Sequence, residues 1–346
     1  MQDIHIRLGA ALAPDGVPLH YGDQAAEFHA ARRGAALMDR SHEGRLTLTG
    51  RDRLALPHRM STNDLESLKP GEGRPTLFTN PNARVIDRAT VYNRGETVLL
   101  VTEPGRGEAL CLYLQRNIFF NDDARLSDIT GTTRQFNLHG EQADAAIAAL
   151  GVPDLPPMRG VEFTLGGGVA FIARNKPLSG SHWMIVAANE HAPAVWEALL
   201  ATGRVKAAGS LAYNALRISS GRPGVGRELS SEYIPLEIGL WDEVSFHKGC
   251  YTGQEIIARM ESRGRVARTL VALALEAAVN APAPLTAEGR EIGTLTSSVT
   301  TPDGEHVGLG VIKVAAARVG AALRADDVPA TIMRLPGAQP PSLDPE

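Results

Sequence analysis

Residues 246–268 read FHKGCYTGQEIIARMESRGRVAR and hold more potential chemistry than any other stretch of the chain. Within them, Thr252–Glu255 matches the S/T-x-x-E capping box, and the apolar pair Ile256 and Ile257 follows it. This pattern predicts a helix that begins just after Cys250.

Cys250 has two interpretations. The unpaired amides and the dipole of a helix N-terminus favour an anion, and Lys248 adds a positive charge two residues before the thiol. This arrangement predicts a reactive thiolate. Alternatively, the glycines form a tight turn and Cys250 is a small buried filler, as free cysteines often are. The spacing alone leaves both open.

The composition sets outer bounds on the protein. It has 346 residues, of which 43% are hydrophobic and 21% charged, as in globular proteins, and no apolar run nears the roughly 20 residues that cross a bilayer. The N-terminus lacks a basic segment followed by an apolar one, so we expect a cytoplasmic protein with no membrane contact. Its two cysteines, Cys111 and Cys250, are then expected to stay reduced. A net charge of -4 argues against non-specific nucleic-acid binding by the whole chain, but allows a local basic patch.

The order of predicted elements indicates the fold class. A strand, a glycine and a helix follow one another at residues 45–60, and similar strand-to-helix units recur at 135–150 and 183–200. A hairpin is predicted over 84–102, a capped helix over 23–34 and a further helix over 105–117. These units predict an α+β fold with mostly antiparallel sheets. Neither G-x-G-x-x-G after a strand nor a P-loop occurs, so nucleotide-binding folds have no support.

From Thr269 onward the sequence becomes rich in short β segments. They lie at residues 269–276, 291–299, 306–314 and 330–334, and predicted turns at Pro282, Pro284, Gly289 and Asp303–Gly304 separate them. We expect a small C-terminal β-barrel. The predicted domains are therefore 1–266, with two α+β subdomains, then the barrel at 267–336 and a disordered tail at 337–346.

No metal site or hydrolase motif is predicted. The ten histidines show no H-E-x-x-H spacing, and C-x-x-C and G-x-S-x-G do not occur. Five histidines are interpreted individually as structural residues rather than metal ligands: His42, His139, His182, His247 and His306.

The segment Lys248–Glu255, followed by Ala258–Arg259 and Arg263–Gly264, is similar to the signature of the YgfZ family, a branch of the glycine-cleavage T-protein (GcvT) superfamily. Leu46–Asp64 resembles the family's first strand-glycine-helix unit, and 215–221 resembles its R-x-x-x-G segment. The β-rich C-terminus resembles its barrel. The resemblance covers most of the chain and implies a GcvT-like, folate-binding fold.

This resemblance also implies a function. Family members support the assembly or repair of iron-sulfur enzymes, with a connection to tRNA modification, and the cysteine is the functional centre. The expected cofactor is tetrahydrofolate or a one-carbon derivative, and the expected partners are iron-sulfur client proteins or assembly factors, with weak tRNA contact. Tyr213 falls where the family places an aromatic folate contact, and an aromatic ring can stack on a pterin. The candidate functional residues are Cys250 and Lys248 at the reactive centre and, for folate, Tyr213, Asp87, Arg217, Tyr251, Gln254 and Arg259.

Two alternatives remain. The first is a folate-dependent aminomethyltransferase or methyltransferase like the T-protein, whose Asp-Asp pair reads Asp87–Arg88 here. The T-protein segment that supplies a pterin-binding glutamate appears as Leu178–His182, without an acid. A hydrogen bond to an ionised group is worth about 1.5–3 kcal/mol, so its loss predicts weaker or reorganised folate binding. The second alternative is an RNA-binding protein that uses the local net charge of +3 between Lys248 and Arg268.

Overall fold

The structure is a computed structural model that describes residues 1–262 and 266–338. Two sets of predictions lie outside those residues: the basic positions Arg263 and Arg265, and most of the tail expected at 337–346. The described chain divides into two compact units. The domain boundary expected after residue 266 stays a prediction. The first unit comprises Met1–His58, Leu65–Pro75 and Ala89–Leu216, and the second comprises Arg59–Asp64, Thr76–Arg88 and the described residues from Arg217 onward.

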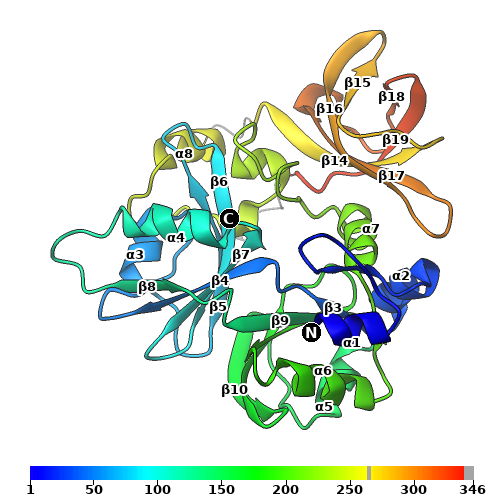
Figure 1. The fold of residues 1–346 in the computed structure, drawn as a ribbon. Helices are drawn as coiled ribbons and strands as arrows, with labels where there is room; N and C mark the ends of the chain where they lie inside the picture. Colours follow the sequence, from blue (N-terminus) through cyan, green and yellow to red (C-terminus); the bar gives the residue numbers. More distant parts are fainter. Residues whose placement is uncertain (263–265, 339–346) are drawn as a thin grey trace. The chain divides into compact units, whose positions relative to one another are not determined.

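The first unit contains a six-stranded sheet, of which Figure 1 labels strands β3, β9 and β10. Its order is β10-β11-β12-β9-β3-β13, and neighbouring strands are antiparallel except for β13 and β3. This pairing confirms the predicted α+β class with mostly antiparallel sheets. The strands are β3 (Ala36–Asp39), β9 (Thr133–Gly140), β10 (Arg159–Leu165), β11 (Gly168–Asn175), β12 (Ser181–Ala188) and β13 (Lys206–Ala207).

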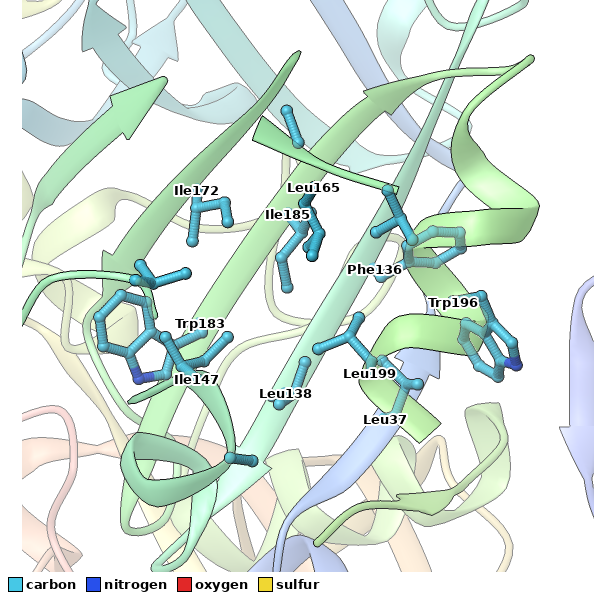
Figure 2. Close-up of a cluster of buried hydrophobic side chains, with 14 of the residues drawn as sticks. Leu37, Phe136, Leu138, Ile147, Leu165, Ile172, Trp183, Ile185, Trp196 and Leu199 are labelled. Carbon is cyan, nitrogen blue, oxygen red and sulfur yellow. The ribbon is translucent and has the colours of Figure 1, made fainter. Parts of the chain in front are cut away.

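One face of this sheet carries the main core of the first unit (Figure 2). Because successive side chains of a strand alternate between faces, Phe136 and Leu138 of β9 point into this core together with Trp183 of β12. Helices α5 (Ala143–Ala148) and α6 (Ala192–Ala201) contribute Ile147 and Trp196 to it. Each buried side chain of this size stabilises the fold by about 1.5–3 kcal/mol. The alternate residues of β9, at positions 135, 137 and 139, therefore lie on the opposite face of the sheet.

A five-stranded sheet has the order β5-β6-β7-β4-β8. The predicted hairpin is confirmed as the antiparallel pair of β6 and β7. The division between the units crosses β5 and β6. Within the first unit, the rings of Tyr92 and Phe171 meet edge to face with centroids 5.3 Å apart. The strands are β4 (Glu43–Thr49), β5 (Gly73–Thr79), β6 (Val85–Asn93), β7 (Val98–Pro104) and β8 (Arg125–Asp128).

The helices follow the predicted order. Helix α2 (Gln24–Arg33) begins where Asp23 Oδ1 accepts a hydrogen bond from the Ala26 amide at 2.9 Å, and it ends at Gly34, as the capping pattern predicts. None of the helices in the described part of the chain is long and apolar enough to span a membrane. The remaining early elements are α1 (Gln2–Arg7), β1 (Ala11–Leu12), β2 (Pro18–His20), α3 (Ala55–Met60), α4 (Gly107–Gln115) and α7 (Ser210–Ser220), of which α3 and α7 continue across the division.

The second unit contains the predicted barrel, which closes in the order β14-β17-β16-β15-β18-β19. Two of its strands were not predicted, β15 and β18. Pro284, predicted as a turn residue, lies inside β15 opposite Thr294. Proline has no amide hydrogen to donate, and it is tolerated here next to a shift of register between Leu285 and Thr286. The barrel elements are β14 (Arg268–Leu275), β15 (Ala283–Ala287), β16 (Arg290–Thr300), β17 (His306–Lys313), η3 (Val314–Ala316), β18 (Ala322–Ala325) and β19 (Val328–Arg334).

The segment before the barrel packs into the same unit. It contains η1 (Pro235–Ile238), η2 (Trp241–Glu243) and α8 (Gln254–Ser262). Helix α8 confirms the helix predicted after Cys250, but the predicted capping box is wrong. Gly253 has φ +86, which is not a helical conformation, so it cannot be the first helical residue after a Thr252 cap. A common core joins these elements to the barrel, with Leu77, Val85, Leu236, Trp241, Tyr251, Ile257, Leu270 and Val311 among its buried members.

Candidate functional site

The loop that carries Cys250 is held by its neighbours on both sides. Lys248 Nζ donates a hydrogen bond to the Ser61 carbonyl at 2.7 Å and lies 5.2 Å from the centroid of the Tyr251 ring. Tyr251 is buried, and burial raises the pKa of its phenol to about 12. Thr79 Oγ1 donates to the Thr252 carbonyl at 2.5 Å. These contacts fix the backbone before and after the cysteine.

Gly253 completes the turn into α8. A Cβ atom at this position would lie 2.8 Å from the Asn80 carbonyl oxygen and 2.9 Å from the Ala83 Cα, and the φ of +86 is strained for any other residue. The turn therefore requires glycine. Cys250 itself is exposed, which excludes its interpretation as a buried filler, whereas Cys111 is buried in α4. The reactivity of the Cys250 thiol stays a prediction.

Helix α8 presents two further candidates, Gln254 and Arg259. Gln254 is its first residue and is partly exposed. Arg259 Nη2 donates to Glu255 Oε1 at 2.9 Å across one helical turn, and both side chains are largely exposed. Exposed pairs of this kind contribute about 0–1 kcal/mol. The contact leaves the guanidinium accessible.

Asp87 lies in β6 beside a buried ion pair. The residue is 4% exposed, and its Oδ1 accepts a hydrogen bond from the Arg88 amide at 2.8 Å. The Arg88 guanidinium donates to both oxygens of Glu243 at 2.6 and 2.7 Å, in the bidentate geometry that arginine favours. Arg222 lies 3.5 Å from the same carboxylate. The second unit thus places an aspartate next to a strong buried ion pair.

Arg217 takes part in a separate network. Its guanidinium lies 3.5 Å from Glu228 Oε2 and donates to Ser297 Oγ at 3.2 Å. Glu228 is fully buried and also accepts from the Thr296 and Ser297 hydroxyls of β16. Arg217 therefore links the end of α7 to the barrel strand β16.

A row of polar side chains crosses the six-stranded sheet on the face opposite its main core. Gln135, Asn137 and His139 are consecutive members of this row on β9, and all three are buried. Apolar clusters cover the same face on either side of them. One cluster contains Tyr92, Leu99, Phe171, Met184 and Val186, and the other contains Ala31, Ala36, Met38, Ala208, Ala212 and Leu216.

Arg40 connects this polar row to Tyr213. Its guanidinium carbon lies 3.7 Å from the centroid of the Tyr213 ring, which is a close cation-π contact. Glu43 holds the other side of the guanidinium, with Oε1 at 2.7 Å from both Nε and Nη2. Glu43 Oε2 in turn accepts a hydrogen bond from Gln135 Nε2. The carboxylate of Glu43 keeps the pKa of Arg40 above its ordinary value in spite of burial.

His139 has an unusual environment at the end of the row. Its ring is 0% exposed, stacks on His182 with centroids 4.2 Å apart, and lies 5.7 Å from Tyr213. Burial, followed by His182 and Arg40, holds the pKa of His139 well below its ordinary range, so the ring is neutral. Among the described residues, neither of its ring nitrogens has a hydrogen-bond partner, and the same holds for Gln135 Oε1.

Lys248, Cys250 and Tyr251 lie in one loop of the second unit, and their proposed roles stay predictions. Asp87 and Arg217 belong to the same unit but to different networks, and Tyr213 belongs to the first unit. Arg40 and the polar row were not predicted as functional residues. The alternation Gln-Phe-Asn-Leu-His at 135–139 was the available signal. Within the described ranges, no three His, Cys, Asp or Glu side chains gather as metal ligands.

Comparisons with known proteins give consistent matches. Residues 2–248 match the GCVT N-terminal domain, and residues 268–339 match the CAF17 C-terminal beta-barrel domain. A chloroplastic protein of Arabidopsis thaliana, to which a transferase activity is attributed, is 34% identical over 316 residues, which cover 90% of this chain and 73% of that protein.

Aminomethyltransferases are similar over nearly the whole chain. That of Moorella thermoacetica is 30% identical over 329 residues, covering 91% of this chain and 89% of the enzyme. That of Geobacillus kaustophilus is 28% identical over 337 residues, covering 93% and 92%. The crystal structure of glycine cleavage system aminomethyltransferase T from Bartonella henselae has a TM-score of 0.86 at 24% identity, over 97% of this chain and 96% of that one. That likeness shows a shared fold.

Proposed function

This chain belongs to the YgfZ branch of the GcvT superfamily, and from this membership we propose that it binds a reduced folate and supports the assembly or repair of iron-sulfur enzymes through Cys250. The proposed clients include enzymes that modify tRNA. The protein then acts as a maturation factor without turnover of its own.

The observation that carries this proposal is the presentation of Cys250. Lys248, Tyr251 and Thr252 are each fixed by contacts within the second unit, and Gly253 is required by the turn. Cys250 alone among them is exposed beside these anchors. A thiol held outward on a fixed backbone is suited to reaction with, or ligation of, a group on another molecule.

The residues of the first unit fit a reduced folate. Tyr213 provides an aromatic ring, and the buried polar atoms without partners on His139 and Gln135 fit a polar, planar ligand. Such a folate would supply a one-carbon unit. We propose Tyr213 as a contact to it, while the roles of Asp87, Arg217, Tyr251, Gln254 and Arg259 stay predictions.

Complementation tests the proposal. A null strain should lose iron-sulfur enzyme activities, and the wild-type gene should restore them. Cys250→Ala should fail to restore them, whereas Cys111→Ala, at the buried cysteine, should succeed if the variant accumulates to the same level. Full rescue by Cys250→Ala would exclude the proposed role of the thiol.

A folate-dependent transferase is the second candidate, because aminomethyltransferases match nearly the whole chain and Asp87 is a buried acid. Purified protein with tetrahydrofolate and an aminomethyl or methyl donor should then turn over, and Asp87→Asn should abolish turnover. Asp3→Asn, the same substitution at an exposed position in α1, provides the control. Absence of turnover in the folded, folate-binding protein would contradict this candidate.

We further propose weak contact with tRNA. Its basis is the charge around α8, where Arg259 is accessible. Binding through phosphates weakens steeply as salt rises. Titration of labelled tRNA at two salt concentrations should show this slope, and affinity without it would contradict phosphate contact.

A further inference from the structure

We propose that His139 and Gln135 recognise the polar edge of the pterin ring when a reduced folate binds. This inference rests on the proposed function and names the residues of the first unit that select the ligand. It assigns to the polar row of β9 a task that the sequence motifs do not indicate.

The first support is the lack of hydrogen bonds at these atoms. Both ring nitrogens of His139 and Oε1 of Gln135 are buried without partners among the described residues, four positions apart on the same strand face. On folding, such atoms lose hydrogen bonds to water and gain none, so apolar residues would be more favourable there. The apolar clusters on either side show that this face accepts such residues readily.

The second support is the chemistry of the row. A neutral imidazole offers one donor and one acceptor, and the amide oxygen of Gln135 offers an acceptor. The complementary ligand edge carries N-H donors beside an acceptor, as the amino and oxo groups of a pterin do. The charged groups nearby are already paired, because Arg40 is held by Glu43, so the row favours this neutral edge over a carboxylate tail.

The third support is the pair of rings around His139. His182 stacks on it at 4.2 Å with an interplanar angle of 25°, and Tyr213 lies 5.7 Å away. Both of these side chains are partly exposed, whereas His139 is enclosed. A planar ligand therefore reaches His139 when His182 or Tyr213 moves aside, and it can take over their ring contacts.

Calorimetric titration with 5-formyltetrahydrofolate tests the inference. We expect His139→Leu to weaken binding at least about tenfold, equivalent to about 1.4 kcal/mol. Its melting temperature without ligand should equal or exceed that of the wild type, because the unpaired nitrogens are gone. A purely structural role for His139 predicts the opposite change in melting temperature. The matched control, His191→Leu at a position outside the row, should bind like the wild type.

A second variant and a second ligand separate the possible outcomes. His139→Phe preserves a planar ring without its nitrogens and should lose affinity as His139→Leu does. If both variants bind like the wild type, or both fail to fold, the inference is overturned while folate binding stands. If the wild type binds no 5-formyltetrahydrofolate, the proposed folate function itself fails. p-Aminobenzoylglutamate, the tail alone, should bind equally to all variants, and a selective loss in the His139 variants would assign the row to the tail instead.

Discussion

Lys248 Nζ donates a hydrogen bond to the main-chain carbonyl of Ser61 at 2.7 Å. The contact ties the Cys250 loop to the segment after α3, within the second unit. The same ammonium faces the Tyr251 ring, so the Lys248 side chain contacts both the Ser61 segment and the residue that follows Cys250. Lys248 thus positions the loop whatever its electrostatic effect on the thiol.

Lys248→Met should therefore lower the free energy of unfolding. The methionine keeps most of the aliphatic stem but loses a charge-assisted hydrogen bond, which is worth about 1.5–3 kcal/mol. Urea denaturation measures the change. Lys206→Met, at an exposed lysine in the first unit, is the control and should have almost no effect. Equal stabilities of the two variants would show that the bond to Ser61 contributes nothing.

The two cysteines should differ sharply toward a thiol reagent. In the folded protein an aromatic disulfide reagent should label Cys250 quickly, because it is exposed, and should leave buried Cys111 unlabelled. Denaturation should release the second thiol. Cys250→Ser should remove the fast phase without changing the slow one. Fast labelling that survives in Cys250→Ser would contradict the assignment of the exposed thiol.

Glu243→Gln should destabilise the second unit strongly. Arg88 donates to both oxygens of this carboxylate, and Arg222 lies next to it, so the substitution leaves buried positive charge without its counter-ion. Breaking one side of a buried pair costs about 3–5 kcal/mol. Glu255→Gln removes the exposed partner of Arg259 and should cost less than about 1 kcal/mol. Denaturant melts of both variants provide the test, and similar losses would contradict it.

The fold could largely be predicted from local patterns. Asp23 and Gly34 delimit α2 because caps act within one turn, and the strand-to-helix unit at 135–150 predicted β9. The failures also have local causes. Gly253 adopts a left-handed conformation that a four-residue motif does not specify, and Pro284 is a turn signal that a register shift accommodates inside a strand.

The candidate site was harder to predict because long-range packing defines it. Polar residues that alternate along an antiparallel strand usually face water. Here the face that carries Gln135 and His139 is covered, because Tyr92 and Ala212 bring apolar clusters to either side of it. No spacing rule connects these distant residues. Cys250, by contrast, belongs to a continuous motif, so the sequence alone could single it out.

Stability should fall on mild acidification because of buried neutral histidines. Burial lowers the pKa of His42 to about 3, and it holds the pKa of His139 well below the ordinary value of 6.5. Above about pH 6.5 these rings are neutral in both states and have no effect. Below about pH 6.5 these histidines bind protons in the unfolded chain but stay neutral in the folded protein. Unfolding is therefore favoured progressively as the pH falls, for His42 until about pH 3.

His139→Leu isolates one of these contributions. At about pH 5.5, one unit below the ordinary histidine value, a ring that stays neutral in the fold should cost the wild type about 1.4 kcal/mol relative to pH 7.5. Over the same pH interval the free energy of unfolding of the variant should fall by about that amount less than that of the wild type, because position 139 no longer binds a proton. Denaturant melts at the two pH values measure the difference. Parallel losses in the wild type and the variant would mean that His139 takes up its proton in the folded protein, contrary to its enclosure beneath His182 and Tyr213.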